Sequence, residues 1–275
     1  MLPPNVIRRN NLSIEGNLYS EQTIVFANGF GTNQSAWRYV KASFYKDYKL
    51  VLFDHTGGGH SDSRFYDHHR YASLEGYAED LVEIGAALNL THAVFVGHSV
   101  SGMVGLLASL SKPSLFEKII LIGASPRYAN QGFYKGGFEE DDLEALFSLM
   151  RTNYYEWVQG FAKVAMQNQH KPVLRAEFAK SLLSLRPDIA LSVARTIFLS
   201  DYREILAQVE KEVLILQTEH DVAVPSEVAA YLHNRIKGSK LEIIHTEGHF
   251  PHMSAHEEVT SAIMRFLNPS LPVSQ

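Results

Sequence analysis

The chain contains no cysteine and has little excess charge, since 25 lysines and arginines stand against 30 aspartates and glutamates, for a net charge of −5. The absence of cysteine excludes disulfides, zinc sites built on thiolates and a cysteine nucleophile. Without a basic excess or a Lys/Arg stripe, the sequence lacks the electrostatic signature of a nucleic-acid-binding protein. No run of 18 apolar residues occurs, so we expect no membrane-spanning helix. What remains has the composition of a globular protein, with 45% hydrophobic residues.

The first residues do not resemble a secretory signal. Residues 1–5, Met-Leu-Pro-Pro-Asn, lack a basic region followed by an apolar run. We therefore expect a cytoplasmic protein, present in the nucleus as well if the source is a plant. A length of 275 residues suits an α/β fold that carries an insertion. The mixed charge and the single compact fold predict a monomer.

The most informative segment is 94–102, Val-Phe-Val-Gly-His-Ser-Val-Ser-Gly. An apolar, β-branched run leads into Gly-His-Ser, and a helix-compatible run follows at 103–110. This strand–turn–helix context is what a nucleophile elbow requires, because the sharp turn presents the serine hydroxyl above the sheet. The positions two before and two after the serine must be small; Gly97 meets this, whereas position 101 is serine instead of the usual glycine. We predict Ser99 as the nucleophile of a serine hydrolase, in preference to a chance Gly-x-Ser.

A serine nucleophile needs a base, and the base needs an orienting acid. In the α/β-hydrolase layout they follow in the order nucleophile, acid, histidine. Residues 212–218 predict a buried strand, and Asp221 lies in the loop after it, at the end where open α/β sheets place their sites. Residues 240–244 predict the last strand, and His249 lies in the loop that follows. The predicted catalytic triad is Ser99, Asp221 and His249.

Other side chains nearby offer similar chemistry. His220 and His252 lie close in sequence to the predicted acid and base, and composition alone leaves either open as the base. Glu219 stays open as the acid, although Asp-x-x-Val-Pro after a strand favours the aspartate. We expect His98, beside the serine, to pack and to hydrogen-bond rather than act as the base, because neighbours in a tight turn point apart.

The oxyanion hole of this layout uses two backbone N–H groups, one from the residue after the nucleophile and one from a loop after an early strand. Val100 supplies the first. Residues 23–27 predict the early strand, and Asn-Gly-Phe-Gly at 28–31 predicts the loop, whose glycines allow the backbone to turn an amide toward the pocket. We predict Phe30 as the second donor, with its side chain lining the pocket; a plain glycine-rich turn is the alternative.

Short apolar runs alternate with helical patterns along the chain, which is typical of βαβ units and a mostly parallel sheet. The first two strands are expected as a hairpin-like pair. The expected elements are strands at 7–14, 23–27, 49–53 and 118–122 and helices at 34–44 and 74–88.

Two segments imitate ligand-binding motifs. The glycines at 57–59 lack the lysine of a phosphate loop and do not open directly into a helix, so we expect a structural turn. Asp-His-His at 67–69 has no partner cluster with ligand spacing, which favours a solvated loop over a metal site. We predict neither a metal nor a cofactor.

The strand pattern stops after residue 123, and only helical periodicity remains until about residue 196. The expected helices are 139–150, 153–166, 173–183 and 187–198. A helical insertion between the strands of an α/β hydrolase is a lid over the active site. We therefore predict an α/β-hydrolase fold, with a mostly parallel sheet flanked by helices, in which 1–123 and 197–275 form the core and 124–196 form a four-helix lid.

The lid segment is rich in aromatic residues. Trp157 and Phe161, at i and i+4, share one helix face. We expect this face to point into the pocket; packing between lid helices is the alternative. Such a pocket suits a compact, largely apolar ligand with a few polar groups.

With these elements in place, the chain resembles one subgroup of α/β hydrolases, which contains the bacterial stress-response regulator RsbQ and the plant karrikin and strigolactone receptors. The resemblance covers nearly the whole chain, lid included. The segments that carry it are Gly-Phe-Gly-Thr-Asn-Gln-Ser-Ala-Trp at 29–37, Phe-Asp at 53–54, Gly-x-Gly-His-Ser-Asp at 57–62, Gly-His-Ser-Val-Ser-Gly-Met at 97–103, Ile-Gly-Ala-Ser-Pro-Arg-Tyr at 122–128, Gly-Gly-Phe-Glu at 136–139, Arg-Pro-Asp-Ile at 186–189 and Glu-Gly-His-Phe-Pro-His-Met-Ser at 247–254.

This resemblance implies a four-helix lid, a Ser99–Asp221–His249 triad and small-molecule signalling by a slow hydrolase. Ser101, which departs from the general elbow pattern, is similar to the plant-receptor version of it. Tyr128 stands where the plant receptors have phenylalanine, which predicts a more polar pocket. The pocket residues implied by the resemblance are Phe30, Tyr128, Trp157, Phe161 and Phe198.

Two functions follow from these observations. In the first, the protein is an ordinary small-molecule carboxylesterase without a signalling role. In the second, the same triad hydrolyses a small ester or butenolide-like lactone slowly, and the lid changes shape to engage a signalling partner protein. The match within the lid favours the second, because lids otherwise vary freely. A catalytically inactive binding protein is disfavoured, because all three triad chemistries are present.

Overall fold

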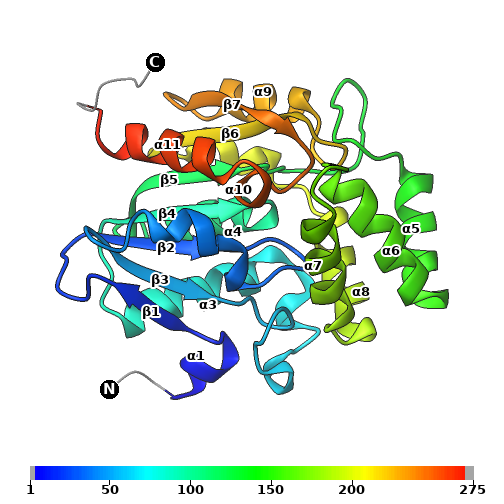
Figure 1. Cartoon of the computed structure of the whole chain (residues 1–275), viewed down its shortest axis with the longest axis horizontal. Coiled ribbons are helices and arrows are strands. Elements are labelled where there is room, and N and C mark those ends of the chain that lie inside the picture. The colour runs from blue at the N-terminus through cyan, green and yellow to red at the C-terminus, as the bar shows by residue number, and fades with distance from the viewer. Residues whose placement is uncertain (1–3, 270–275) are drawn as a thin grey trace.

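The computed structural model describes residues 4–269, and a seven-stranded sheet runs through its centre (Figure 1). The strands lie in the order β1-β3-β2-β4-β5-β6-β7, with β1 antiparallel to β3 and the remaining neighbours parallel. The predicted architecture, a mostly parallel sheet flanked by helices, is confirmed. The strands are β1 (Ser13–Gly16), β2 (Thr23–Ala27), β3 (Lys49–Phe53), β4 (Ala93–His98), β5 (Phe116–Ile122), β6 (Glu212–His220) and β7 (Lys240–Glu247).

The expected hairpin between 7–14 and 23–27 is wrong. Pro4–Arg9 form helix α1, and β1 pairs with β3, where Ile14 lies opposite Val51. The physical reason is burial: every residue of β2 is buried, as expected of a central strand in a parallel sheet, whereas every residue of β1 is half-buried. The polar sequence Ser-Ile-Glu-Gly of β1 therefore lies at the sheet edge.

Helices cover both faces of the sheet, because alternate strand residues point to opposite faces. In β2, for example, Ile24 and Phe26 join one buried cluster and Val25 joins the other. The first cluster includes residues of α2 and α11, and the second includes residues of α3, α4 and α9. These helices are α2 (Arg38–Ala42), α3 (Leu74–Ala87), α4 (Val100–Ser111), α9 (Ser226–Arg235) and α11 (His256–Leu267), and a short helix α10 (Pro251–Ser254) precedes the last of them.

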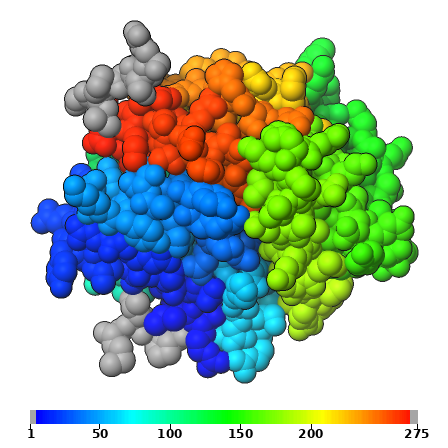
Figure 2. All heavy atoms as spheres, in the orientation of Figure 1, coloured from blue at the N-terminus to red at the C-terminus, as the bar shows by residue number. Residues whose placement is uncertain are grey.

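Four further helices occupy the range assigned to the lid and lie together at one side of the sheet (Figure 1). Figure 2 shows them in green, forming one flank of the molecule. Their starts are encoded locally: Pro172 and Pro187 occupy first-turn positions, and the Asn153 side chain accepts from the Glu156 amide. The helices are α5 (Glu140–Thr152), α6 (Tyr154–Met166), α7 (Pro172–Leu183) and α8 (Pro187–Phe198). The division of the chain into core and lid units stays a prediction.

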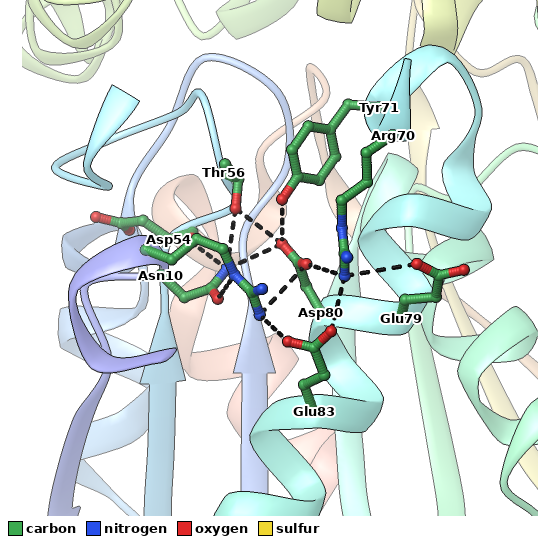
Figure 3. A network of polar contacts seen from close by, with 9 residues as sticks. Asn10, Asp54, Thr56, Arg70, Tyr71, Glu79, Asp80 and Glu83 are labelled. Atoms are coloured by element: carbon green, nitrogen blue, oxygen red, sulfur yellow. Dashed lines mark hydrogen bonds and ion pairs between the residues drawn. The ribbon is translucent and has the colours of Figure 1, made fainter. Parts of the chain in front are cut away.

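A buried ionic network ties α1 and α3 to the segment between α1 and β1 and to the loop after β3 (Figure 3). Its centre is Asp80 of α3, whose side chain is 1% exposed. Two guanidinium groups approach this carboxylate, from Arg9 at 3.3 Å and Arg70 at 2.8 Å. Neutral donors complete its shell: the Asn10 amide and the hydroxyls of Thr56 and Tyr71. The negative charge of Asp80 is thus fully compensated inside the protein.

Between residues 4 and 269, no helix combines the length and the apolar character that a membrane span requires.

Candidate active site

The turn between β4 and α4 has the geometry of a nucleophile elbow. Ser99 has φ +57° and ψ −127°, which is a strained conformation for a residue with a side chain. The turn is fixed on both sides, because the Ser99 amide donates to Ile122 O at 2.8 Å and the Gly102 amide donates to Ser99 O at 2.9 Å. A Cβ atom at Gly97 would lie 2.8 Å from the Ser101 backbone, so glycine is required where strand and helix cross.

The three residues predicted as a triad lie in one hydrogen-bonded chain. Ser99 Oγ is 2.8 Å from His249 Nε2, and His249 Nδ1 is 2.7 Å from Asp221 Oδ2. An ionised carboxylate can only accept, so the histidine donates from Nδ1 and its Nε2 is free to accept from the serine. Asp221 is held in turn, because its Oδ1 accepts from the amides of Ala223 at 2.8 Å and Val224 at 3.1 Å. This arrangement can transfer the serine proton to the imidazole.

The alternatives to these residues lie elsewhere. Glu219 and His220 are exposed at the end of β6. His252 is fully buried against Trp37 and His98, at ring separations of 4.5 Å and 4.4 Å, and burial lowers its pKa to about 3. His98 Nε2 lies 2.7 Å from the carbonyl oxygen of His249, and burial holds the pKa of His98 well below its usual value. His98 therefore packs and hydrogen-bonds, and it supports the loop of the histidine that contacts Ser99.

The two residues predicted to supply the oxyanion hole flank the serine. Val100 begins α4, so its N–H is among the first-turn amides that lack an intrahelical acceptor. Phe30 lies in the loop after β2, and this loop packs tightly on the elbow: a Cβ atom at Gly29 would lie 2.5 Å from His98 Nδ1 and 3.0 Å from Ser99 Cβ. The role of both amides as oxyanion donors stays a prediction.

The predicted pocket residues form two aromatic groups near the serine. Trp157 and Phe161 stack on each other at 5.1 Å, and their centroids lie 6.2 Å and 6.4 Å from that of Phe30. This face of α6 therefore points toward the loop after β2. In the second group, the Tyr128 hydroxyl is 3.3 Å from Ser99 Oγ, and its ring packs on Phe198 at 5.1 Å.

A second serine–histidine pair lies beside the elbow, and sequence reasoning missed it. Ser101 Oγ donates to Asn28 O at 2.6 Å and lies 2.6 Å from His55 Nε2. Serine at position 101 thereby anchors the start of the loop that contains Phe30. The sequence held one signal for His55, since it lies in the loop directly after β3, at the same sheet edge as the triad.

The end of α6 contacts the loop that carries His249. The His249 amide donates to Ala165 O at 2.8 Å, and the Asn168 side chain donates to Glu247 O. Gly248 has φ +87°, and a Cβ atom there would lie 2.3 Å from the Met166 carbonyl oxygen. The lid segment and the backbone of the histidine loop are therefore in direct contact.

The motifs that imitate ligand sites form ordinary loops. The glycines at 57–59 make a turn, in which the Gly58 amide donates to His55 O at 2.8 Å. His68 and His69 are exposed. Across residues 4–269, no cluster of three or more histidine, cysteine, aspartate or glutamate side chains has an arrangement suited to a metal ion.

Comparison with known proteins adds independent findings. A family model described as the alpha/beta hydrolase fold matches residues 22–255. The chain is 41% identical over 265 residues to the Karrikin insensitive 2 receptor CA of Petunia hybrida, covering 96% of this chain and 97% of that one. It is 45% identical over 247 residues to a strigolactone esterase of Pisum sativum, covering 89% and 91%. Among solved structures, a hydrolase from Oleispira antarctica superposes with a TM-score of 0.93 at 36% identity, covering 98% and 99% of the two chains.

Proposed function

The chain belongs to the α/β-hydrolase fold family, as an ester-acting enzyme in the subgroup of the karrikin and strigolactone receptors, and from this premise we propose a specific activity for it. The protein hydrolyses a small, largely apolar ester or lactone through Ser99, His249 and Asp221. It does so slowly, and it serves as a sensor that engages a partner protein. The observation that carries the catalytic part is the hydrogen-bonded chain from Ser99 Oγ through His249 to Asp221.

The proposed reaction follows from the positions of these atoms. Ser99 Oγ attacks the carbonyl carbon of the ester, and its proton passes to His249 Nε2. The amides of Phe30 and Val100 bind the resulting oxyanion. The tetrahedral intermediate collapses to an acyl-enzyme, and His249 gives the proton to the leaving alcohol. A water molecule then attacks the acyl-enzyme, with His249 again as base, and releases the acid and the free serine. Asp221 keeps the proton of His249 on Nδ1 throughout.

The surroundings of the serine support the proposed ligand class. Aromatic rings from the β2 loop and from α6 approach each other, and the Tyr128 hydroxyl lies 3.3 Å from Ser99 Oγ. Rings of this kind favour a compact apolar body, and a single hydroxyl gives it one polar contact. A butenolide-like lactone has both features.

The sensor part rests on the contact between α6 and the histidine loop. A ligand bound or covalently attached at Ser99 or His249 changes the contacts of the His249 side chain. The His249 backbone amide donates a hydrogen bond to the end of α6. A change at the reacting atoms therefore has a short mechanical route into the lid. The second candidate, an ordinary carboxylesterase without a signalling role, is favoured by the completeness of the triad alone.

The experiment that tests the catalytic part follows hydrolysis of a fluorogenic butenolide and of a fluorogenic acetate ester, by fluorescence and by intact-protein mass spectrometry. We expect slow turnover of the wild type with an adduct on Ser99 or His249, and neither turnover nor adduct in Ser99→Ala. Unchanged activity of Ser99→Ala would overturn the triad.

The sensor part is tested in the same samples by limited proteolysis of the lid. We expect the butenolide to change the cleavage rate within the lid, residues 124–196, in the wild type and not in Ser99→Ala. Rapid turnover of many unrelated esters, without an adduct and without a change in lid cleavage, would make the protein an ordinary esterase.

A further inference from the structure

A small cavity lies next to the two proposed oxyanion donors, between the loops after β2 and β3 and helix α8. Its volume is about 30 Å³, which is more than one water molecule requires. Phe30 and Val100 both border it, and so does Gly29, which packs on Ser99. Much of the remaining wall is aliphatic, formed by Val104, Leu185, Val193 and Ile197.

Three residues of this wall each carry a buried polar atom that forms no hydrogen bond of ordinary geometry within residues 4–269: Asn28 Oδ1, His55 Nδ1 and the Tyr77 hydroxyl, which lies near the hydroxyl of Tyr66. Asn28 is 2% and Tyr77 4% exposed, and the His55 and Tyr77 rings meet edge to face at 5.5 Å. A buried polar atom without a partner destabilises the fold by about 1–3 kcal/mol. Three such atoms around one cavity therefore point to an occupant that satisfies them.

The protonation of His55 follows from its neighbours. Ser101 Oγ has one proton, which it donates to Asn28 O, so His55 Nε2 must donate to Ser101 Oγ. Burial lowers the pKa of His55 to about 4, so the ring is neutral at neutral pH. The remaining atom, Nδ1, then carries a lone pair and no proton. It is a hydrogen-bond acceptor.

Asn28 has a similar constraint. Its Nδ2 donates to Thr32 O at 2.8 Å, which fixes the amide orientation and leaves Oδ1 as an acceptor. The cavity wall thus offers two acceptors and one tyrosine hydroxyl, which can donate or accept. A cation is disfavoured because the wall contains no carboxylate and much of it is apolar. The complementary group is a neutral O–H, which donates to an acceptor and accepts from Tyr77.

We propose that this cavity is a subsite for a hydroxyl group of the substrate, with His55 Nδ1 as the acceptor of its hydrogen bond and Tyr77 as the donor to its oxygen. The inference deepens the proposed function and rests on it. It narrows the substrate class to esters or lactones that carry a hydroxyl a few bonds from the reacting carbonyl, because Gly29, Phe30 and Val100 link the cavity to the surroundings of Ser99. Water supplies the same O–H chemistry, and the experiment separates these two sources.

The test compares 4-nitrophenyl butyrate with both enantiomers of 4-nitrophenyl 3-hydroxybutyrate. We expect kcat/KM of the wild type to be about tenfold higher for one hydroxylated enantiomer, which is the factor that one net hydrogen bond of about 1.4 kcal/mol gives. In Tyr77→Phe and His55→Leu this ratio falls to one or below, because each variant removes one partner of the hydroxyl. Tyr134→Phe is the matched control, since it removes a buried tyrosine hydroxyl that bonds to Arg127 O instead; we expect it to keep the wild-type ratio.

A second readout does not depend on turnover. Binding of the same esters to Ser99→Ala, measured by calorimetry, should show the same tenfold preference, and Tyr77→Phe in that background should abolish it. Equal values for the plain and hydroxylated esters, in kcat/KM and in affinity, would overturn the subsite and leave the cavity to water alone. Hydrolysis of neither ester, with the binding preference intact, would instead overturn the proposed hydrolase function and leave the subsite standing.

Discussion

Two carboxylates in this protein are buried to the same extent and have opposite surroundings. The side chains of Asp80 and Asp221 are each 1% exposed. Asp80 contacts two guanidinium groups and three neutral donors (Figure 3). Asp221 contacts two backbone amides and one imidazole, with no arginine or lysine ion pair among the described residues. One carboxylate is neutralised by fixed charges, and the other faces a group that can gain and lose a proton.

This difference separates stabilisation from chemistry. Loss of the Asp80 charge leaves Arg9 and Arg70 paired with the partly exposed carboxylate of Glu83 and without a buried counter-charge, so the region is suited to hold α1, α3 and the β3 loop together. Near His249, the partner of Asp221, burial keeps His98 and His252 neutral, and beside the elbow it keeps His55 neutral; at least one ring nitrogen of each has no hydrogen-bond partner among the described residues. These unpaired polar atoms are available to hydrogen-bond with a ligand or with groups that form during a reaction.

The same substitution in the two regions gives the sharpest test. In Asp221→Asn, the amide can still accept from Ala223 and Val224 through Oδ1, but its NH₂ then faces His249 Nδ1. The histidine must move its proton to Nε2, where it can no longer accept from Ser99. We expect kcat on a fluorogenic ester to fall by about 10³–10⁴-fold, the largest effect considered, while the midpoint of urea unfolding changes little. Retained activity would show that Asp221 does not orient the base.

Asp80→Asn should have the opposite pattern of effects, with a large loss of stability and little change in activity. The substitution leaves Arg9 and Arg70 without their buried counter-charge, and we expect the free energy of unfolding to fall by about 3 kcal/mol. The specific activity of the folded fraction should stay within about twofold of wild type, since Asp80 contacts none of the reacting groups. The measurement is urea unfolding followed by active-site titration. A stability equal to that of the wild type would contradict the structural role of the charge.

The neutral histidines give the protein a defined sensitivity to acid. Their pKa values in the folded state are lowered, to about 4 for His55 and about 3 for His252. Below pH 6.5 the unfolded chain therefore binds more protons than the folded one, so stability is lost as the pH falls. Each group contributes a loss of about 2 kcal/mol at pH 5. We expect His252→Phe, whose ring fits beside Trp37, to reduce the slope of unfolding free energy against pH between 6 and 4 by about one proton.

The smallest effect is expected at the rim of the ionic network. Glu79 lies next to Asp80 in sequence and pairs with Arg70 at 3.5 Å, but its side chain is 64% exposed. Ion pairs of this kind stabilise little, because water screens the attraction and the side chains lose freedom. Glu79→Ala should lower the free energy of unfolding by less than about 0.5 kcal/mol. A loss as large as that of Asp80→Asn would mean that burial is not what distinguishes the two carboxylates.

Much of the fold and the triad geometry could be predicted from the sequence because both depend on local patterns. Apolar runs predicted the strands after 23, and sites in parallel sheets follow strand ends, which placed Ser99, Asp221 and His249 at one edge before any contact was known. The predicted hairpin between the first two strands was wrong. β1 pairs with β3 because of which strand is buried, and the spacing of residues along the chain does not encode that.

The side-chain hydrogen-bond networks could not be predicted from the sequence for a related reason. Asn10, Thr56 and Asp80 are distant in the sequence and meet only after folding. The pairing of His55 with Ser101 likewise joins residues 46 positions apart. A motif records the residues of one segment, whereas these contacts are properties of the assembled sheet.

The bond between the His249 amide and Ala165 O has a consequence in terms of thermodynamic linkage. If a bound ligand shifts the lid toward one arrangement by some factor, then any protein that binds that arrangement raises the affinity for the ligand by the same factor, since coupling free energies are reciprocal. The partner is then a co-ligand of the pocket. Its presence should tighten ligand binding to the Ser99→Ala variant even when the two molecules never touch.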